Sequence, residues 1–392
     1  MTRYFDYAAT TPTDPRVVEE MSPYYTEQFG NPNSLYSIGR DAFKALENAR
    51  ERIAALIGAK PEEIIFTSGG TEADNAAFIS TLNRLAPEGG AHLITSAYEH
   101  HAVLEVAQWL EKRGHELTVV SPREDGHVHS EDVAKAMRPN TKVVSIIMAN
   151  NEIGTINDIA AIAKIAHEGG ALMHTDAVQA LGKIPLNVEE LGVDMMALSA
   201  HKIYGPRGIG ALYLKRGTRF DPFIKGGGQE SRRRSGTQNV AGAIGFARAL
   251  EIATEEMVTE EARLSKLRDY IIEQVTTRLE NTLATVESDK RLPNIVPLLI
   301  KGVEGEAMLL QLDNQGFSVS TGSACSSGSL EPSHVLLSIG VAQEVAHGSL
   351  RVSLGRWSTM EDCEALVEAL VPIVERLRAM SPVYKKMFCG EE

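Results

Sequence analysis

Cysteine is scarce in this chain, whose 392 residues include only Cys325, Cys363 and Cys389. Three scattered cysteines are too few for a disulfide framework and lack the CxxC spacing of a complete metal site. No apolar run approaches the roughly 20 residues that span a bilayer. The first residues, MTRYFDYAATTP, lack the basic flank and apolar stretch of a signal peptide. These absences predict a cytoplasmic protein that does not enter a membrane.

Positive charge is also in deficit, since 39 Lys and Arg stand against 52 Asp and Glu, a formal net charge of −13. The average field of such a chain repels phosphate backbones and anionic lipids, so nucleic acid is not an expected partner. The remaining composition, 43% hydrophobic and 23% charged with 33 Gly and 16 Pro, is that of a globular protein. At a prior of about 150 residues per domain, the length suggests two or three domains.

Short apolar and β-branched runs alternate with helical stretches from about residue 60 to 215, which is typical of an α/β domain with parallel strands. The expected strands, which we predict to be buried on both faces, are 63–67, 92–95, 117–120, 143–147, 171–174, 195–198 and 209–213. A long amphipathic helix over 255–281 leads into an α+β region. That region contains strand-like runs at 294–300 and 350–355 and a final helix over 360–380.

A glycine pair lies between an expected strand and an expected helix, in FTSGGTEADN at residues 66–75. Glycine lets the backbone approach a ligand closely, and N–H groups at a helix start favour an anion such as phosphate. The same pattern also forms an ordinary tight turn and helix cap. By itself the segment leaves both interpretations open.

Two further segments carry residues suited to a cofactor. Asp176, in HTDAVQ, follows a buried-looking strand, where a carboxylate can pair with a protonated ring nitrogen or cap the next helix. Lys202 follows the apolar run DMMALSA, where its amine is suited to form a covalent bond with an aldehyde; an exposed loop lysine is the alternative. A phosphate turn, a strand-end aspartate and a lysine in this order are what a pyridoxal phosphate enzyme needs.

The chain resembles the cysteine desulfurases of the NifS/IscS type, which are fold-type I pyridoxal phosphate enzymes of the class V aminotransferase family. The resemblance runs from end to end and rests on YFDYAATTP, GNP, FTSGGTEADN, Glu99-His100, NNEIG, HTDAVQ, SAHKIYGPRGIGALY, RRRSGT, STGSACSSG and LRVSLGR. It implies a large α/β domain, residues 14–256, with a mainly parallel seven-stranded sheet flanked by helices. Residues 1–13 and 257–392 would form a smaller α+β domain that carries the Cys325 loop.

The resemblance also implies how pyridoxal phosphate is held. Lys202 would bind the cofactor aldehyde, and His100 would stack on the ring and take part in catalysis. Asp176 would pair with the pyridine nitrogen, and Gln179 would hydrogen-bond the phenolic oxygen. The residues around the phosphate would be Gly70, Thr71, Ser199, His201 and, from the partner subunit of a homodimer, Thr237.

Substrate binding would fall to Asn151, which also contacts the cofactor, and to Arg351. The planar fork of an arginine suits the α-carboxylate of L-cysteine, and Arg351 matches the family position, whereas Arg356 is interpreted as structural. Cys325 lies in STGSACSSGS, whose small residues offer few anchors, so we expect a loop that can move. Its thiol would take sulfur from L-cysteine as a persulfide and leave L-alanine. Cys363 and Cys389 fit structural interpretations.

The resemblance implies partners as well. The short Cys325 loop resembles the branch that supplies iron–sulfur cluster assembly, so an IscU/NifU-like scaffold protein and other sulfur acceptors are expected. Cys325 is also a candidate metal ligand for a [2Fe–2S] cluster shared with that scaffold. One departure is Tyr36, where many relatives carry His after Asn-Pro-x-Ser-x.

Three alternative functions remain. A selenocysteine lyase or an aminotransferase on the same fold would not need Cys325. A non-catalytic sulfur or iron–sulfur binding module is expected to have lost the lysine that this chain retains at position 202.

Overall fold

The structure is a computed structural model that describes residues 2–286, 288–321, 332–385 and 388. Its larger sheet has seven strands in the order β2-β8-β7-β6-β5-β3-β4. The strands are β2 (Ile64–Thr67), β3 (His92–Ser96), β4 (Glu116–Val120), β5 (Thr141–Ser145), β6 (Leu172–Asp176), β7 (Met195–Ser199) and β8 (Gly210–Leu214). All pairings are parallel except those of β8 with β2 and β7. The seven strands expected from the sequence are confirmed, with ends displaced by up to two residues.

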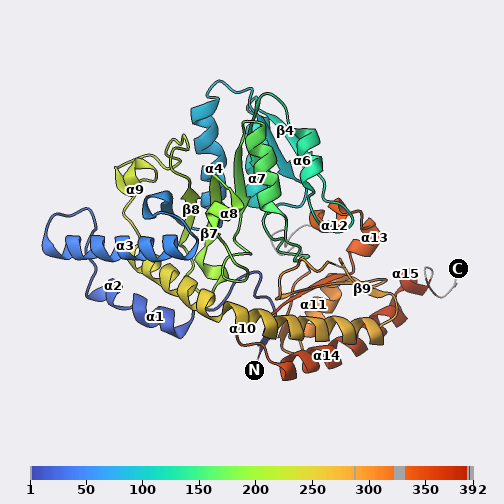
Figure 1. Ribbon diagram of the computed structural model, residues 1–392. Helices are drawn as coiled ribbons and strands as arrows, with labels where there is room; N and C mark the ends of the chain where they lie inside the picture. Colours follow the sequence, from blue (N-terminus) through green and yellow to red (C-terminus); the bar gives the residue numbers. More distant parts are fainter. Residues whose placement is uncertain (1, 287, 322–331, 386–387, 389–392) are drawn as a thin grey trace.

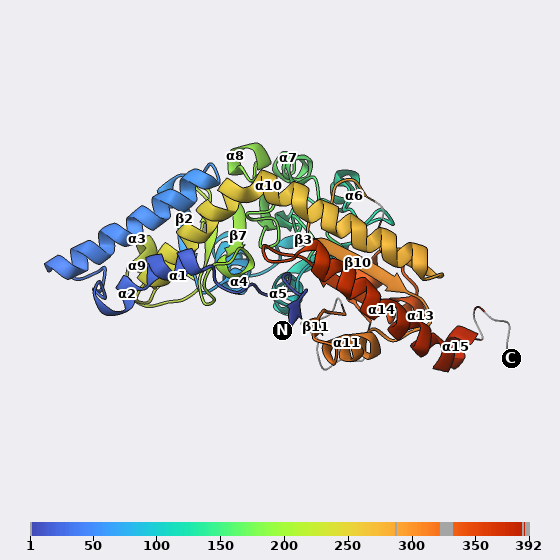
Figure 2. The ribbon, with the colours of Figure 1, turned by 90° about the horizontal axis from the view of Figure 1, so that it is seen from below.

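Helices cover both faces of this sheet, as Figures 1 and 2 show. Ile65, Met195 and Ala197 point to the face that packs on α4 (Gly70–Leu85) and α5 (His101–Glu111). The alternate residues of the same strands point to the opposite face, which is covered by α3 (Ser37–Leu56), α7 (Ile159–Glu168) and the first half of α10 (Val240–Arg278). Double coverage explains why these strands read as continuous apolar runs.

Strand β4 departs from the prediction that the strands are buried on both faces. It lies at the edge of the sheet, with a neighbour on one side only among the described strands. Glu116 and Val119 are exposed, and the exposed fraction of Val119 is 44%. An edge strand that is only partly covered by helices leaves polar and apolar side chains in solvent, so the expectation of complete burial was wrong here.

A smaller antiparallel sheet, in the order β12-β10-β9, follows in the chain. Its strands are β9 (Thr282–Ala284), β10 (Ile295–Ile300) and β12 (Ser349–Ser353), and a separate pair joins β1 (Arg3–Tyr4) to β11 (Phe317–Ser318) in parallel. A second apolar cluster forms where the last half of α10 meets α14 (Met360–Met380) and α11 (Gly305–Asp313). Figure 2 shows α10 running from beside α3 to beside α14.

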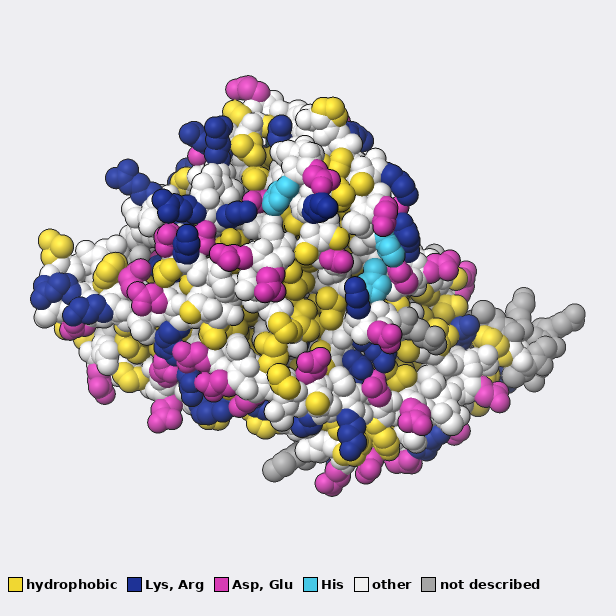
Figure 3. Space-filling model, in the orientation of Figure 1, with side chains coloured by type: hydrophobic (Ala, Val, Ile, Leu, Met, Phe, Trp, Pro, Cys, Tyr) yellow, Lys and Arg dark blue, Asp and Glu magenta, His cyan; other side chains and the backbone are white. Residues whose placement is uncertain are grey.

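The remaining helices are short, and they complete the fold around the two sheets. They are α1 (Pro15–Met21), α2 (Pro23–Thr26), α6 (Ser130–Ala136), α8 (Val188–Leu191), α9 (Gln229–Arg232), α12 (His334–Ser338), α13 (Gln343–Ala346) and α15 (Pro382–Tyr384), with 3-10 turns at Pro61–Glu63 and Ala200–Lys202. Figure 3 shows acidic and basic side chains interspersed over one face of the molecule. In the part of the chain that the structure describes, no helix is long and apolar enough to cross a membrane.

Candidate active site

Three strand ends converge on one cavity of about 320 Å³. Strand β6 ends at Asp176 and β7 at Ser199, while β2 leads through Ser68 and Gly69 into α4. Because neighbouring parallel strands end at the same edge of a sheet, side chains far apart in the sequence meet there. The predicted site residues that line the cavity are Gly70, Thr71, His100, Asn151, Asp176, Gln179, Ser199, His201, Lys202 and Arg351.

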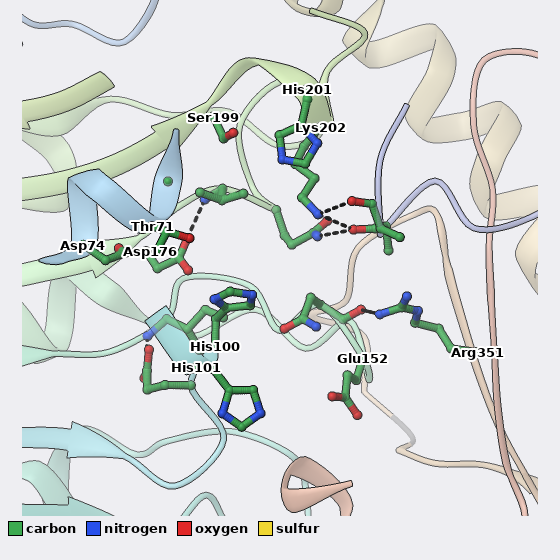
Figure 4. A pocket seen from close by; sticks show the side chains of 18 of the residues that line it. Thr71, Asp74, His100, His101, Glu152, Asp176, Ser199, His201, Lys202 and Arg351 are labelled. Carbon is green, nitrogen blue, oxygen red and sulfur yellow. Dashed lines mark hydrogen bonds between the residues drawn. The ribbon is translucent and has the colours of Figure 1, made fainter. Parts of the chain in front are cut away.

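Lys202 projects into this cavity from the short 3-10 turn that follows β7 (Figure 4). Its Nζ donates hydrogen bonds to the backbone oxygens of Ala8 and Ala9, each at 2.7 Å. These bonds connect the N-terminal segment to the turn and hold the amine beside the strand ends. The lysine therefore lies where an aldehyde group in the cavity could reach it.

Three buried carboxyl groups, those of Asp74, Glu99 and Asp176, line the same cavity. Burial raises the pKa of Asp176 to about 6, although the charge on Lys202 opposes that shift. Burial also raises the pKa of Glu99 to about 8, and burial together with the charges of Asp176 and Glu99 raises that of Asp74. Asp176 accepts one hydrogen bond at Oδ1 from the backbone N of Val178, at 2.8 Å. A cationic ring nitrogen in the cavity would stabilise the charged form of Asp176.

Two histidines of the site are held in the neutral form. His100 caps α5, and its Nδ1 accepts a hydrogen bond from the backbone N of Ala102 at 3.1 Å. His201 Nδ1 lies 3.1 Å from Thr10 Oγ1. Burial and the charge on Lys202 lower the pKa of each imidazole to about 4. At neutral pH each ring can therefore accept or donate a hydrogen bond without carrying positive charge.

The end of the cavity near α4 has the features of a phosphate site. Ser199 is buried, and its Oγ has no hydrogen-bond partner among the described residues. Gly70 begins the 16-residue helix α4, and a Cβ atom there would lie 2.7 Å from Val178 Cγ2. Thr71 is exposed in the next position. A helix N-terminus, an unpartnered hydroxyl and a glycine required by close packing together fit an anionic group.

Arg351 enters the cavity from the smaller sheet, on β12. Its Nη1 donates to the backbone oxygen of Asn151 at 3.1 Å, and its Nη2 donates to Asp6 Oδ1 at 2.8 Å. The Nε atom is buried without a partner among the described residues. Arg356 instead pairs with Asp14 and is not among the residues that line this cavity. These contacts support the interpretation of Arg351 as the substrate arginine and of Arg356 as a structural one.

Two expected residues are not placed in the cavity. Thr237 is exposed and is not part of the lining, while the neighbouring Arg234 pairs with Glu72 of α4 at 2.8 Å. Cys325 lies outside the described residues, as does Cys389. Cys363 is fully buried in α14, and burial raises the pKa of its thiol to about 12. A thiol in this state is a poor nucleophile.

The structure adds residues that the sequence did not single out. Asp74, Glu99 and Glu152 lay within recognised motifs, but nothing in the sequence distinguished them from structural residues. Ser333 Oγ donates to Glu152 Oε2 at 2.5 Å, and His334 Nε2 lies 2.9 Å from the backbone oxygen of Glu99. Neither Ser333 nor His334 belongs to a motif, so no sequence signal could have assigned them to the site.

Residues 3–366 match the family model described as Aminotransferase class-V. The cysteine desulfurase IscS of Dictyoglomus turgidum is 51% identical over 383 residues, which cover 98% of this chain and 97% of that protein. The chain belongs to the cysteine desulfurases of the class-V aminotransferase family.

Solved structures of this family agree with the fold. A NifS-like protein has a TM-score of 0.90 at 36% identity, covering 96% of this desulfurase and 100% of that chain. The structure titled SspA in complex with cysteine has a TM-score of 0.80 at 34% identity, with coverages of 91% and 100%. The expected fold-type I architecture is thereby confirmed, and membership of the family implies pyridoxal phosphate as cofactor.

Proposed function

We propose that the chain is a pyridoxal phosphate-dependent cysteine desulfurase that converts L-cysteine to L-alanine and leaves a persulfide on Cys325. The observation that carries the proposal is the single cavity in which Lys202, Asp176 and Arg351 meet. These residues supply a covalent anchor for an aldehyde, a partner for a ring nitrogen and a fork for a carboxylate. The names of the relatives agree with this chemistry.

When bound, pyridoxal phosphate supplies an electron sink that weakens the bonds at Cα and Cβ of an amino acid. Lys202 would hold the aldehyde carbon, and Asp176 would keep the ring nitrogen protonated. Gly70, Thr71, Ser199 and His201 would hold the phosphate, and Gln179 the phenolic oxygen. His100, which is neutral at the pH of the cytoplasm, would pack against the ring and can accept a proton there.

Substrate orientation would depend on Arg351 and Asn151. The Asp6 carboxylate balances the buried charge of Arg351, so the guanidinium is already oriented before a substrate arrives. Its Nε–H would add a bond to the substrate carboxylate. The Cys325 thiolate then attacks the substrate sulfur, so that one S–S bond forms, the Cβ–S bond breaks, and its electron pair is protonated at Cβ to give alanine.

Incubation with L-cysteine tests this function. We expect alanine as the product and added sulfur on the peptide that contains Cys325, detected by mass spectrometry. A keto acid without alanine would identify an aminotransferase instead. Activity confined to selenocysteine, with no sulfur on the enzyme, would identify a selenocysteine lyase.

We further propose that the active form is a homodimer, residues 14–256 forming its large domain and residues 1–13 with 257–392 its small domain. Thr237 of one subunit would complete the phosphate site of the other. The exposure of Thr237 supports this arrangement, because an exposed hydroxyl can reach a partner subunit. The Arg234–Glu72 pair anchors the segment that carries Thr237 beside α4 of its own subunit. Light scattering tests it, and a fully active monomer would refute it.

The proposed acceptor of the sulfur is an IscU/NifU-like scaffold protein for iron–sulfur cluster assembly, beside other acceptors in the cytoplasm. Cys325 would deliver the persulfide and is a candidate ligand of a [2Fe–2S] cluster shared with the scaffold. Deletion of residues 382–392 should weaken sulfur delivery and spare alanine formation if the C-terminal segment docks this partner. Unchanged scaffold affinity would argue against such docking.

A further inference from the structure

Lys183 lies behind the reaction site, in the turn that follows β6. Its Nζ donates to the backbone oxygen of Gln179 at 3.0 Å and contacts the side-chain Oε1 of the same residue at 3.4 Å. The other end of that amide, Nε2, donates to the backbone oxygen of Ala8 at 2.9 Å. A lysine only donates hydrogen bonds, so the Gln179 side-chain atom that faces Lys183 must be the amide oxygen, and the amide nitrogen then faces Ala8.

The backbone oxygen of Ala8 connects Lys183, through the Gln179 amide, to the amine of Lys202. Ala8 O accepts from both Gln179 Nε2 and Lys202 Nζ. Lys202 also lines a second, smaller cavity of about 40 Å³, and Lys183 lies in the wall of that cavity. Lys202 therefore faces the reaction cavity on one side and shares the second cavity with Lys183.

The wall of the second cavity combines apolar surface with several charged side chains. The other charged side chains in its wall are Glu256, Glu260 and Glu261 of α10 and Arg356. Asn294 also lines it, and both polar atoms of its amide are buried without a partner among the described residues. The volume, about 40 Å³, is sufficient for a water molecule beside the two lysines.

We propose that Lys183 is a positioning residue of the reaction site, which orients the Gln179 amide and places a second cationic group behind Lys202. The proposal rests on the proposed role of Lys202. Nearby positive charge makes a lysine more nucleophilic, because it disfavours the protonated amine. Burial of the Lys183 amine and the charge on Lys202 lower the pKa of Lys183 to about 7, and the repulsion between the two amines is mutual. Lys183 also lowers the pKa of His201, so its influence extends to the phosphate side.

Three substitutions separate the two parts of this role. Lys183→Met removes both the charge and the hydrogen bonds, Lys183→Gln removes the charge and retains a donor, and Lys183→Arg retains both. Lys164→Met is the matched control, because Lys164 is a lysine with a side chain 76% exposed that pairs with Glu168 at the surface. Circular dichroism establishes that each full-length variant is folded.

The first measurement is competitive acetylation of Lys202 in cofactor-free protein over a range of pH. Lys183 of the parent is charged below its own pKa of about 7, so in the Met and Gln variants we expect the reactivity of Lys202 to fall by up to about tenfold below pH 7 and to match the parent above about pH 8. The Arg variant and the Lys164→Met control should keep at least the reactivity of the parent below pH 7. Unchanged Lys202 reactivity below pH 7 in both neutral variants would overturn the proposal.

The second measurement is the pH titration of the cofactor absorption in the loaded enzyme. Its midpoint should rise in the Met and Gln variants, and cofactor retention should fall severalfold in the Met variant alone, because only that variant loses the bond that orients Gln179. Equal retention in the Met and Gln variants would refute the orienting role. If borohydride fixed the cofactor on another lysine, the proposed function would be wrong, whereas the cofactor-free titration would still decide the effect of Lys183 on Lys202.

Discussion

The two walls of the reaction cavity are built in different ways. On the wall formed by the large sheet, Asp176 and Ser199 end neighbouring parallel strands, and the register of β6 with β7 determines their separation. On the opposite wall, Arg351 comes from β12 of the small sheet, and its position depends on Asp6 and Asn151. The cofactor wall thus follows from the geometry of one sheet, whereas the substrate wall requires three distant segments to meet.

The electrostatic character of the walls differs as well. The sheet wall contains buried carboxyl groups whose pKa values burial raises, and Glu99 stays protonated at neutral pH. The opposite wall presents a buried guanidinium that is already paired with Asp6. Cofactor binding should therefore depend on pH and on the side chains at the strand ends. Substrate binding should depend on the contacts that orient Arg351.

The largest effect is expected from loss of the lysine on the sheet wall. Lys202→Ala should lower turnover by at least about 10⁴-fold, because no other residue takes over its covalent role. The purified variant should lack covalently bound cofactor by absorbance and mass. Lys164→Ala is the surface control. Residual turnover near that of the parent would show that the sheet wall does not supply the anchor.

Cys325→Ser should lower turnover by about 10³-fold or more, since a serine hydroxyl is a far weaker nucleophile toward sulfur than a thiolate. Cofactor binding should be retained, because the sheet wall is unchanged. Cys363→Ser is the matched control, and its buried thiol predicts unchanged sulfur transfer. Normal sulfide release by Cys325→Ser, or sulfur found on Cys363, would exclude the proposed carrier.

Substitution on the substrate wall should separate binding from cofactor chemistry. Arg351→Lys should raise KM for L-cysteine by about 10- to 100-fold through loss of charge-assisted bonds, while the cofactor spectrum stays that of the parent. Steady-state kinetics measures this effect. Arg356→Lys is the control, expected to change stability more than KM. A changed spectrum in Arg351→Lys would mean that the two walls are not independent.

The smallest effect is a pH-dependent change in stability from Glu99 on the sheet wall. Its folded pKa, about 8, exceeds that of an unfolded glutamate. Glu99 therefore contributes most stability below the unfolded pKa of about 4.5, and the contribution is lost as pH rises to about 8. Glu99→Gln should match the parent near pH 4, below the unfolded pKa, and exceed it by about 1–3 kcal/mol near pH 9.

Thermal unfolding of the cofactor-free protein measures the Glu99 effect as a difference in midpoint between the two pH values. Glu105→Gln, at an exposed position of α5, serves as the control, because its side chain is 73% exposed. A constant difference between Glu99→Gln and the parent across this range would show that Glu99 ionises normally.

Local sequence signals predicted much of the fold. The predicted final helix, 360–380, matches α14 because Thr359 and Asp362 form a capping box that defines its first turn. Apolar runs that lead to Asp176 and Ser199 predicted β6 and β7. The length of helix α10 was underestimated: the amphipathic helix expected over 255–281 is the second part of one continuous helix that begins at Val240.

The sequence alone determined the approximate elements, because capping and apolar runs act over a few residues, and its motifs predicted the identities of the reactive residues through the family resemblance. The tertiary structure decided which of them meet. Ala8, Gln179 and Lys183 join behind Lys202, and His334 reaches Glu99, only because separate segments pack around the ends of one sheet. Burial likewise depends on that packing, so the unusual pKa values of Glu99 and Lys183 could not be predicted from neighbouring residues in the chain.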